Sequence, residues 1–218
     1  MRLFVGIALD DAIVRELKAM AARLRSSSGT AAAGLRWTAP ESWHITLQFL
    51  GNALTEQFDC LSARLGEVRS GPVRVELGAL GCFDRTGVLF ADVHATPAMA
   101  ALAERVVAAT SRCGFQAETR PFHPHITLAR RAGNKPPQRT EDVRWGPRQG
   151  PREQGNKKAD SPVRRSGVDH GGSLRQFATR TAGTSPFSRF TAREFLLYES
   201  HLSADGARYE VRGRFPLG

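Results

Sequence analysis

The sequence predicts a mixed fold of strands and helices that arose by internal duplication. Short apolar runs typical of strands alternate with segments whose apolar residues recur at helical spacing. The tetrapeptide His-Ile-Thr-Leu occurs twice, at residues 44–47 and 125–128, although the chain has only four isoleucines. A repeat of that rarity indicates that two parts of the chain share one local structure. The 218 residues are enough for one large domain with its own core.

The first half of the chain predicts two strands, each followed by a helix. An apolar run at 3–9 predicts a buried strand, and Asp10 can cap the helix that follows it. The segment 43–50 predicts the next strand, which Gly51 and Asn52 close. Thr55 can cap a second helix, because apolar side chains recur on one face after it.

The second half repeats this alternation. We expect strands at 73–80 and 88–94, joined by a hairpin turn at 84–87. Thr96 followed by Pro97 predicts a helix start, since proline at the first helical position loses no needed hydrogen bond. Further strands are expected at 125–130, 194–199 and 209–215.

The net charge of +10 is concentrated in one segment. From Gly133 to Arg189 there are 12 basic and five acidic residues, so this stretch alone carries +7. The region from about 132 to 188 is rich in Gly, Pro, Arg and Gln and lacks apolar periodicity, which predicts a disordered basic insertion. A solvated spacer, an RNA-contacting arm and a segment without a role all remain open for it. The global charge is therefore weak support for nucleic-acid binding by the folded part.

The composition excludes several protein classes. No apolar run approaches the roughly 20 residues of a membrane-spanning helix, and the first residues do not form a signal peptide. The three cysteines, Cys60, Cys82 and Cys113, are widely spaced and odd in number. They argue against a disulfide framework and a thiolate zinc site, and favour a reducing cytoplasm. We therefore expect a cytoplasmic, monomeric protein with no membrane partner.

The repeated tetrapeptide places an imidazole beside a hydroxyl twice. Side chains alternate along a strand, so His44 and Thr46 share one face, as do His125 and Thr127. The residues between them, with Leu47 and Phe49, are expected to face the core. If a pseudo-twofold axis relates the halves, both pairs can line one site.

Two facing histidines suit a reaction that removes one proton and gives another, because imidazole titrates near neutral pH. Phosphodiester cleavage matches this set, with hydroxyls and a nearby arginine binding the phosphoryl oxygens. No metal motif and no nucleotide-binding Gly-Lys-Ser/Thr loop is present in the sequence, so we expect no metal and no cofactor.

These residues resemble the RNA 2′,3′-cyclic phosphodiesterase group, also called 2′-5′ RNA ligases, of the 2H phosphoesterase superfamily. The resemblance includes the opening strand, Arg36-Trp37, the segment Trp43 to Gly51, the segment Arg120 to Arg130 and the final hairpin, and so covers about 1–131 and 190–218. It implies an α+β, bilobal fold with a pseudo-twofold duplication, in which two antiparallel sheets with outer helices flank a central cleft.

The resemblance also implies roles for single residues. His44 would be the proton donor to the leaving 3′ oxygen and His125 the proton acceptor that activates water, giving a 2′-phosphate. Thr46, Thr127 and Arg130 would bind the phosphate, although Arg130 has the opposite strand parity to His125, so the strand must end or twist there. The implied partner is RNA with a 2′,3′-cyclic phosphate end, and ATP-independent 2′-5′ joining is the implied reverse reaction.

Several alternatives stay open at this point. Phe122 or Trp37 could stack on a base, or could support the core. His123 has ligand spacing beside His125, but Pro124 between them and the lack of a third ligand disfavour a metal site. His94, His170 and His201 lack a paired threonine. The substrate could also be a small cyclic nucleotide, or the protein could be a non-catalytic RNA- or nucleotide-binding module.

Overall fold

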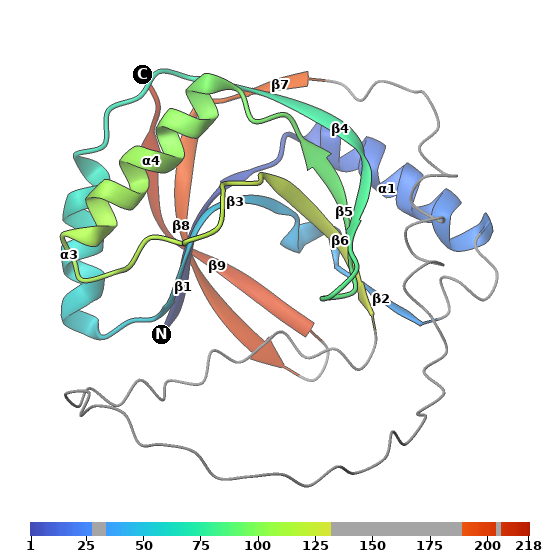
Figure 1. The fold of residues 1–218 in the computed structure, drawn as a ribbon, viewed down its shortest axis with the longest axis horizontal. Coiled ribbons are helices and arrows are strands. Elements are labelled where there is room, and N and C mark those ends of the chain that lie inside the picture. Colours follow the sequence, from blue (N-terminus) through green and yellow to red (C-terminus); the bar gives the residue numbers. More distant parts are fainter. Residues whose placement is uncertain (28–33, 132–188, 204–205) are drawn as a thin grey trace, which may run out of the picture.

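The computed structural model describes residues 1–27, 34–131, 189–203 and 206–218 (Figure 1). The strands are β1 (Arg2–Ala8), β2 (Leu35–Trp37), β3 (His44–Asn52), β4 (Val73–Phe83), β5 (Val88–Val93), β6 (His125–Arg131), β7 (Arg189–Ala192), β8 (Glu194–Ser203) and β9 (Gly206–Pro216). The helices are α1 (Asp11–Ser27), α3 (Thr55–Gly66) and α4 (Pro97–Ser111), and Pro40–Ser42 forms a 3₁₀ turn, η1. The expected insertion at about 132–188 lies outside the described residues.

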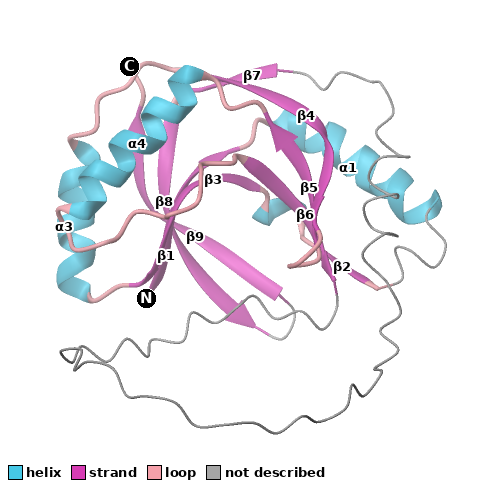
Figure 2. Ribbon diagram, viewed as in Figure 1, coloured by secondary structure: helices cyan, strands magenta, loops and turns pink. Residues whose placement is uncertain are grey.

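The strands form two antiparallel sheets, which confirms the α+β class. Sheet A has the order β3-β1-β8-β9, and sheet B has the order β2-β6-β5-β4-β7. Helices α3 and α4 lie beside sheet A and α1 lies beside sheet B (Figure 2). Side-chain contacts agree with this layering, since Arg25 of α1 stacks 4.8 Å above the ring of Trp37, and Arg212 of β9 lies 5.2 Å from the ring of Phe58 of α3.

The expected duplication is visible in the order of elements. β1, α1 and β3 repeat as β5, α4 and β6, and in each set the motif strand pairs antiparallel with the first strand. One His-Ile-Thr-Leu motif therefore starts a strand of sheet A and the other starts a strand of sheet B. The two motif strands, β3 and β6, lie against each other. The duplication thus brings segments 81 residues apart to one place in the molecule.

A single apolar core joins the two sheets. Its buried members come from all three helices and both sheets, and include Ile7, Leu17, Leu65, Leu102 and Ile126. Burying such side chains is the main favourable contribution to folding, about 1.5–3 kcal/mol for each large aliphatic residue. No described helix combines the length and the hydropathy needed to span a bilayer.

The structure confirms the expected helix cap at Thr96 and corrects the one at Thr55. Thr96 caps α4, because its hydroxyl accepts a 3.2 Å hydrogen bond from the N–H of Met99. The assignment of Thr55 as a cap was wrong. Thr55 is the first helical residue and Leu54 precedes it, with the Leu54 N–H donating to Oε1 of Gln57 at 3.0 Å. Two short strands, β2 and β7, were not expected from the sequence.

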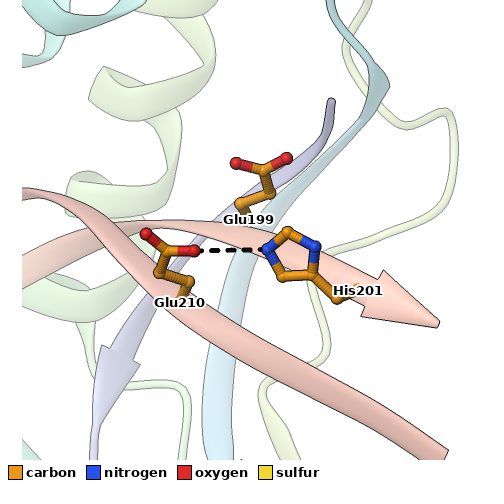
Figure 3. A group of neighbouring side chains, drawn as sticks. All are labelled: Glu199, His201 and Glu210. Carbon is orange, nitrogen blue, oxygen red and sulfur yellow. Dashed lines mark ion pairs between the residues drawn. The ribbon is translucent and has the colours of Figure 1, made fainter. Parts of the chain in front are cut away.

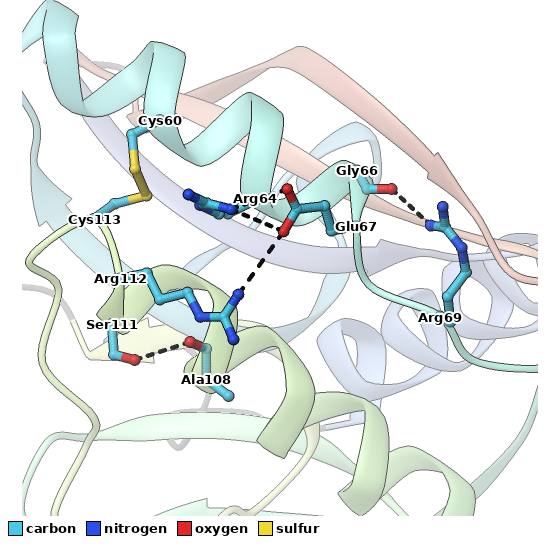
Figure 4. A network of polar contacts seen from close by, with 9 residues as sticks. All are labelled: Cys60, Arg64, Gly66, Glu67, Arg69, Ala108, Ser111, Arg112 and Cys113. Carbon is cyan, nitrogen blue, oxygen red and sulfur yellow. Dashed lines mark hydrogen bonds and ion pairs between the residues drawn. A yellow bond between two sulfur atoms is a disulfide. The ribbon is translucent and has the colours of Figure 1, made fainter.

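The cysteine argument is corrected by the structure. Cys60 of α3 and Cys113, just beyond α4, form a disulfide with their Cα atoms 5.8 Å apart (Figure 4). The two helices lie side by side, so residues separated by 53 positions meet. Glu67, just after α3, forms an ion pair with Arg112, just after α4, and a local one with Arg64 of α3. Three cysteines are therefore compatible with one disulfide, and their number no longer supports a reducing compartment.

We expect the disulfide to stabilise the fold. Closing a chain segment of 53 residues lowers the entropy of the unfolded chain, with a stabilisation of about 2–4 kcal/mol. Reductant, or the Cys113→Ser substitution, should lower Tm by roughly 5–15 °C for a chain of this length. Cys82→Ser, which leaves the disulfide intact, is the matched control. Equal Tm values with and without reductant would show that the disulfide contributes nothing to stability.

Candidate active site

The first histidine is enclosed by aromatic rings. His44 begins β3, and its ring lies 4.6 Å from that of Phe4, 5.0 Å from that of Tyr209 and 5.9 Å from that of Tyr198. Gly6 lets β1 and β3 approach closely beside this ring, because a Cβ there would come within 2.7 Å of the Ile45 carbonyl oxygen. Both tyrosines of the chain thus stand at this site.

A backbone carbonyl fixes the orientation of the His44 ring. Nδ1 lies 2.8 Å from the carbonyl oxygen of Ser42, and a carbonyl can only accept, so Nδ1 carries a proton. Nε2 lies 3.1 Å from the hydroxyl oxygen of Thr46, its motif partner. The backbone thus holds Nδ1, and Nε2 is the ring nitrogen that lies beside Thr46.

The second histidine is held in the same way. His125 begins β6, and its Nδ1 donates to the carbonyl oxygen of His123 at 2.8 Å. Its ring lies 5.0 Å from that of Phe83 and 5.3 Å from that of Phe90. In both halves the carbonyl two residues before the histidine fixes the same tautomer, so the repeat extends to the ring nitrogens.

A bulge in each motif strand decides which side chains join the histidines. Leu47 in β3 and Leu128 in β6, the fourth residues of the two motifs, have no partner in the register of the neighbouring strand. One extra residue reverses the alternation of the side chains that follow it, which in β3 holds up to the next register shift at Leu50. The strand does therefore twist before Arg130, as its expected role requires, and Arg130 joins the face of His125 and Thr127.

The same bulge in β3 overturns the expected position of Phe49. Gln48 is buried in its place, accepting a 2.7 Å hydrogen bond from the hydroxyl of Thr110. The side chain of Phe49 is 54% exposed and its ring lies 6.1 Å from that of Phe4, on the side of His44. Phe49 and Arg130 occupy equivalent positions of the repeat, five residues after each histidine.

Arg130 connects the two halves electrostatically. Its guanidinium lowers the pKa of both histidines, and it interacts with Tyr209 of sheet A. Burial lowers the pKa of Arg130 itself, with the phenol of Tyr209 opposing that shift. Among the residues that the structure describes, no carboxylate lies within ion-pair distance of Arg130. A half-buried guanidinium without an acidic partner is suited to bind a phosphate.

The pKa of His44 is lowered to about 4, mainly by burial and also by the charges of His125 and Arg130, while the hydrogen bond to the Ser42 carbonyl opposes the shift. Burial is also the largest cause that lowers the pKa of His125, with the hydrogen bond to the His123 carbonyl and the charge of Asp92 opposing it. Both rings are thus biased toward the neutral form without a ligand. An anion bound between them would favour the protonated forms.

The low pKa of His44 predicts a pH-dependent stability. The unfolded chain takes up this proton near pH 6.5, before the folded protein does, so stability is lost as the pH falls toward 4. Between about pH 7.5 and pH 5 this group should reduce the free energy of unfolding by about 1–2 kcal/mol. Denaturation of His44→Gln, which cannot titrate, should lack that part of the decline. An identical decline in both proteins would contradict the shifted pKa.

The family assignment rests on the chain's own sequence. The model of the 2'-5' RNA ligase superfamily matches residues 9–152, about two thirds of the chain. The chain belongs to the 2'-5' RNA ligase superfamily. The matched region includes both motifs and confirms the resemblance that they indicate.

Curated members of the superfamily are similar to this chain over part of their length. An Archaeoglobus fulgidus protein named RNA 2',3'-cyclic phosphodiesterase is 32% identical over 133 residues, which are 60% of this chain and 72% of the relative. A Bacillus subtilis protein of the same name is 36% identical over 101 residues, 44% of this chain and 55% of the relative. The chain thus spans about half the length of the Bacillus relative.

Solved structures share the fold of this superfamily member. Escherichia coli LigT in its apo form superposes with a TM-score of 0.63 at 24% identity, covering 99% of this chain and 96% of LigT. A protein of Thermus thermophilus gives 0.64 at 24% identity, covering 100% and 98%. The arrangement of two antiparallel sheets that the resemblance implies is therefore shared with these solved structures.

The remaining expected residues are placed as follows. Thr46 and Thr127 are half-buried on the same strand faces as the histidines. Phe122 and Trp37 pack against the apolar core, which favours their supporting role over stacking on a base. Phe49, Tyr198 and Tyr209 were missed by sequence reasoning, and only their aromatic character in predicted strands could have pointed to them. His170 lies outside the described residues.

One group of side chains could in principle hold a metal ion. Within the described ranges, Glu199, His201 and Glu210 offer ligand atoms that lie within 4.8 Å of one another on the β8–β9 hairpin (Figure 3). Their charges are already paired, since Arg212 binds Glu199 and Nε2 of His201 lies 3.4 Å from Glu210. Glu199 alternates with Tyr198, so this cluster faces away from His44. It gives no reason to place a metal in the reaction.

Proposed function

We propose that this protein hydrolyses the 2′,3′-cyclic phosphate at RNA ends to a 2′-phosphate without a metal ion. The observation that carries the proposal is the matched presentation of two imidazoles. Each has Nδ1 bonded to the carbonyl two residues earlier, and Arg130 lies close enough to lower the pKa of both. The names of the curated relatives support the same reaction.

The reaction can be written with named proton transfers. His125, neutral at Nε2, removes a proton from water as the water oxygen bonds to phosphorus. The bond from phosphorus to the 3′ oxygen breaks, and His44 gives its proton to that oxygen. The products are a 2′-phosphate and a 3′-hydroxyl, with His125 protonated and His44 neutral, and proton exchange with solvent restores both rings.

The phosphate itself favours the charge state that this scheme needs. Unliganded His44, with a pKa of about 4, is neutral at pH 7 and could not donate a proton. A cyclic phosphodiester brings one negative charge against the ring, which raises the pKa of the imidazole. Arg130, Thr46 and Thr127 are the donors assigned to the phosphoryl oxygens, and His44 becomes an acid only when substrate is bound.

The exposed ring of Phe49 supports a nucleotide rather than a bare phosphate as the substrate. Its side chain is 54% exposed beside Phe4 on the face of His44. Aromatic side chains commonly stack on unpaired bases in RNA sites. Escherichia coli LigT has been solved in complex with 3'-AMP, which is consistent with a nucleotide at such a site. We assign base stacking to Phe49 in place of Phe122.

The same groups can join RNA ends when a 5′-hydroxyl takes the place of water. His125 removes the hydroxyl proton as the 5′ oxygen bonds to phosphorus, the bond from phosphorus to the 3′ oxygen breaks, and His44 gives its proton to that oxygen. One phosphoester bond replaces another, so this 2′-5′ joining is reversible and needs no ATP in this scheme. The sequence has no nucleotide-binding Gly-Lys-Ser/Thr loop to supply energy otherwise. We treat hydrolysis as the main reaction, because water is in large excess over RNA ends.

The test is incubation with an oligoribonucleotide that ends in a 2′,3′-cyclic phosphate, in the presence of EDTA. We expect a 2′-phosphate product, identified by its phosphorus NMR signal. A 3′-phosphate product would reverse the assignment of the leaving oxygen, and no turnover would leave only a binding module. A parallel assay with cyclic mononucleotides separates the small-nucleotide alternative, which predicts faster turnover of the short substrate.

The basic insertion can be tested in the same assay. Deletion of residues 134–184 should weaken RNA binding and reduce its salt dependence if the segment recruits RNA. Unchanged affinity would assign it the role of a spacer.

A further inference from the structure

The residue two positions before each catalytic histidine has a second role in the repeat. The carbonyl oxygens of Ser42 and His123 accept from Nδ1 of His44 and His125, both at 2.8 Å. Their position therefore decides which ring nitrogen is protonated and where Nε2 points. Any movement of these two carbonyls would move a catalytic nitrogen.

The side chains of these two residues are each anchored to a neighbouring strand. The hydroxyl of Ser42 donates to the carbonyl oxygen of Ala207 in β9 at 3.1 Å. Nε2 of His123 donates to Oδ1 of Asp92 in β5 at 2.9 Å. Ser42 is thus anchored by a hydrogen bond between neutral groups, whereas His123 is anchored by an imidazole–carboxylate pair. Asp92 is also the cross-strand partner of His125.

We propose that Asp92 and His123 form a positioning pair that holds the second catalytic imidazole in its working tautomer and orientation. The proposal rests on the proposed function and adds two residues that do not touch the reacting atoms. The chain of contacts runs from the Asp92 carboxylate to the His123 ring, and from the His123 carbonyl to Nδ1 of His125.

The side chains of His123 and Asp92 are 49% and 39% exposed, and aromatic packing holds the His123 ring in addition to its contact with Asp92. The ring of His123 meets those of Phe83 and Phe90 edge-on at 5.4 and 5.6 Å, the same two rings that flank His125. The carbonyl of Pro124, between the histidines, accepts from the N–H of Val93 at 3.2 Å. Proline also keeps the residue before it extended. The segment is thus fixed by its side chains and its backbone together.

The two members of the pair act in opposite electrostatic directions on His125. The Asp92 carboxylate raises the pKa of His125, while His123 and Arg130 lower it and burial lowers it most. His44 of β3 also interacts electrostatically with His125. Removing one member alone should therefore shift the titration of His125, and the sign should depend on which member is removed.

The test uses three variants of the full chain. Asp92→Asn keeps an acceptor for His123 but removes the charge, so the acidic limb of the pH profile of kcat/KM should move to lower pH. His123→Gln should move the same limb to higher pH. His123→Ala should lower kcat by about tenfold to a hundredfold with KM near the native value, because the carbonyl loses its anchor.

Matched controls come from the other histidine–carboxylate pair. His201→Gln and Glu210→Gln alter a pair of the same kind on the opposite face of sheet A and should leave the profile unchanged. Circular dichroism and Tm establish that each variant is folded. The proposal would be overturned if the acidic limb of the kcat/KM profile stayed in place in Asp92→Asn and His123→Gln. It would also be overturned if the limb moved in the same direction in both variants.

A measurement without substrate separates this inference from the proposed function. Nitrogen NMR of the ring should show His125 as the Nδ1–H tautomer in the native chain and as a mixture in His123→Ala. An inactive native protein with that change would defeat the proposed function and keep the positioning pair. An active native protein whose His123→Ala variant keeps both tautomer and kcat would defeat the pair and keep the function.

Discussion

Replacing His44 or His125 with alanine is expected to lower turnover of a 2′,3′-cyclic phosphate end by about a hundred- to ten-thousandfold. Each ring is assigned one proton transfer, and neither can replace the other because Nδ1 of each is committed to a backbone carbonyl. Steady-state rates on a cyclic-phosphate oligonucleotide measure the loss. The double variant should be little worse than the worse single variant, since both act on one step.

The control for these variants is His201→Ala. His201 lies in sheet A, on the face opposite to that of His44. The control variant should retain native turnover. His44 packs against Phe4 and Tyr209, so His44→Gln is made as a second variant. Its side chain fills more of the space left by the imidazole than alanine does. Folded variants with native rates would refute the assignment of both histidines.

Replacing Arg130 with alanine is expected to lower kcat/KM by about a hundred- to a thousandfold. The guanidinium is a half-buried cation whose charge lowers the pKa of both imidazoles, and loss of one donor to developing phosphoryl charge has that order of effect. Arg130→Lys should recover only part of the rate, because an ammonium group cannot bind two phosphoryl oxygens as a planar fork. Rates measured against substrate concentration separate losses in binding from losses in turnover.

Arg131→Ala is the matched control, because successive side chains alternate along a strand and Arg131 is therefore expected on the other face of β6. Its rate should stay within a few-fold of native. Equal losses in the two arginine variants would indicate a general charge effect in place of a specific phosphate contact, and would remove Arg130 from the site.

The sequence predicts the site better than it predicts the surroundings of the site. His44, Thr46, His125 and Thr127 follow from an identical tetrapeptide and strand alternation, and both depend on local chain geometry alone. The order of strands and helices follows in the same way from short apolar runs, whereas the α+β class came from the family resemblance. These local features need no knowledge of long-range packing.

Features that depend on packing between distant segments were not predictable in this way. The bulges at Leu47 and Leu128 expose Phe49, bury Gln48 and turn Arg130 toward His125. A bulge is set by how one strand fits its neighbour, which a single strand's pattern does not reveal. Arg130 was assigned only through the family resemblance, and its parity conflict was the one local sign of the bulge.

The disulfide and the aromatic enclosure of His44 have the same origin. Cys60 and Cys113 meet because α3 packs on α4, and Tyr198 and Tyr209 reach His44 because β8 and β9 extend sheet A. The spacing of these residues in the sequence predicts neither the disulfide nor the contacts of the two tyrosines with His44. The aromatic contacts bury the ring of His44. This burial is the largest cause that lowers the pKa of His44, and it so determines when the ring can donate a proton.

The central claim is that two imidazoles from the repeated motifs bind one phosphate between them. Titration with adenosine 2′-phosphate, followed by NMR at the ring protons of His44 and His125, tests it most directly. We predict that both rings respond with one shared Kd and that both pKa values rise. A response of only one ring, or two unrelated Kd values, would mean that the motifs do not form a single site.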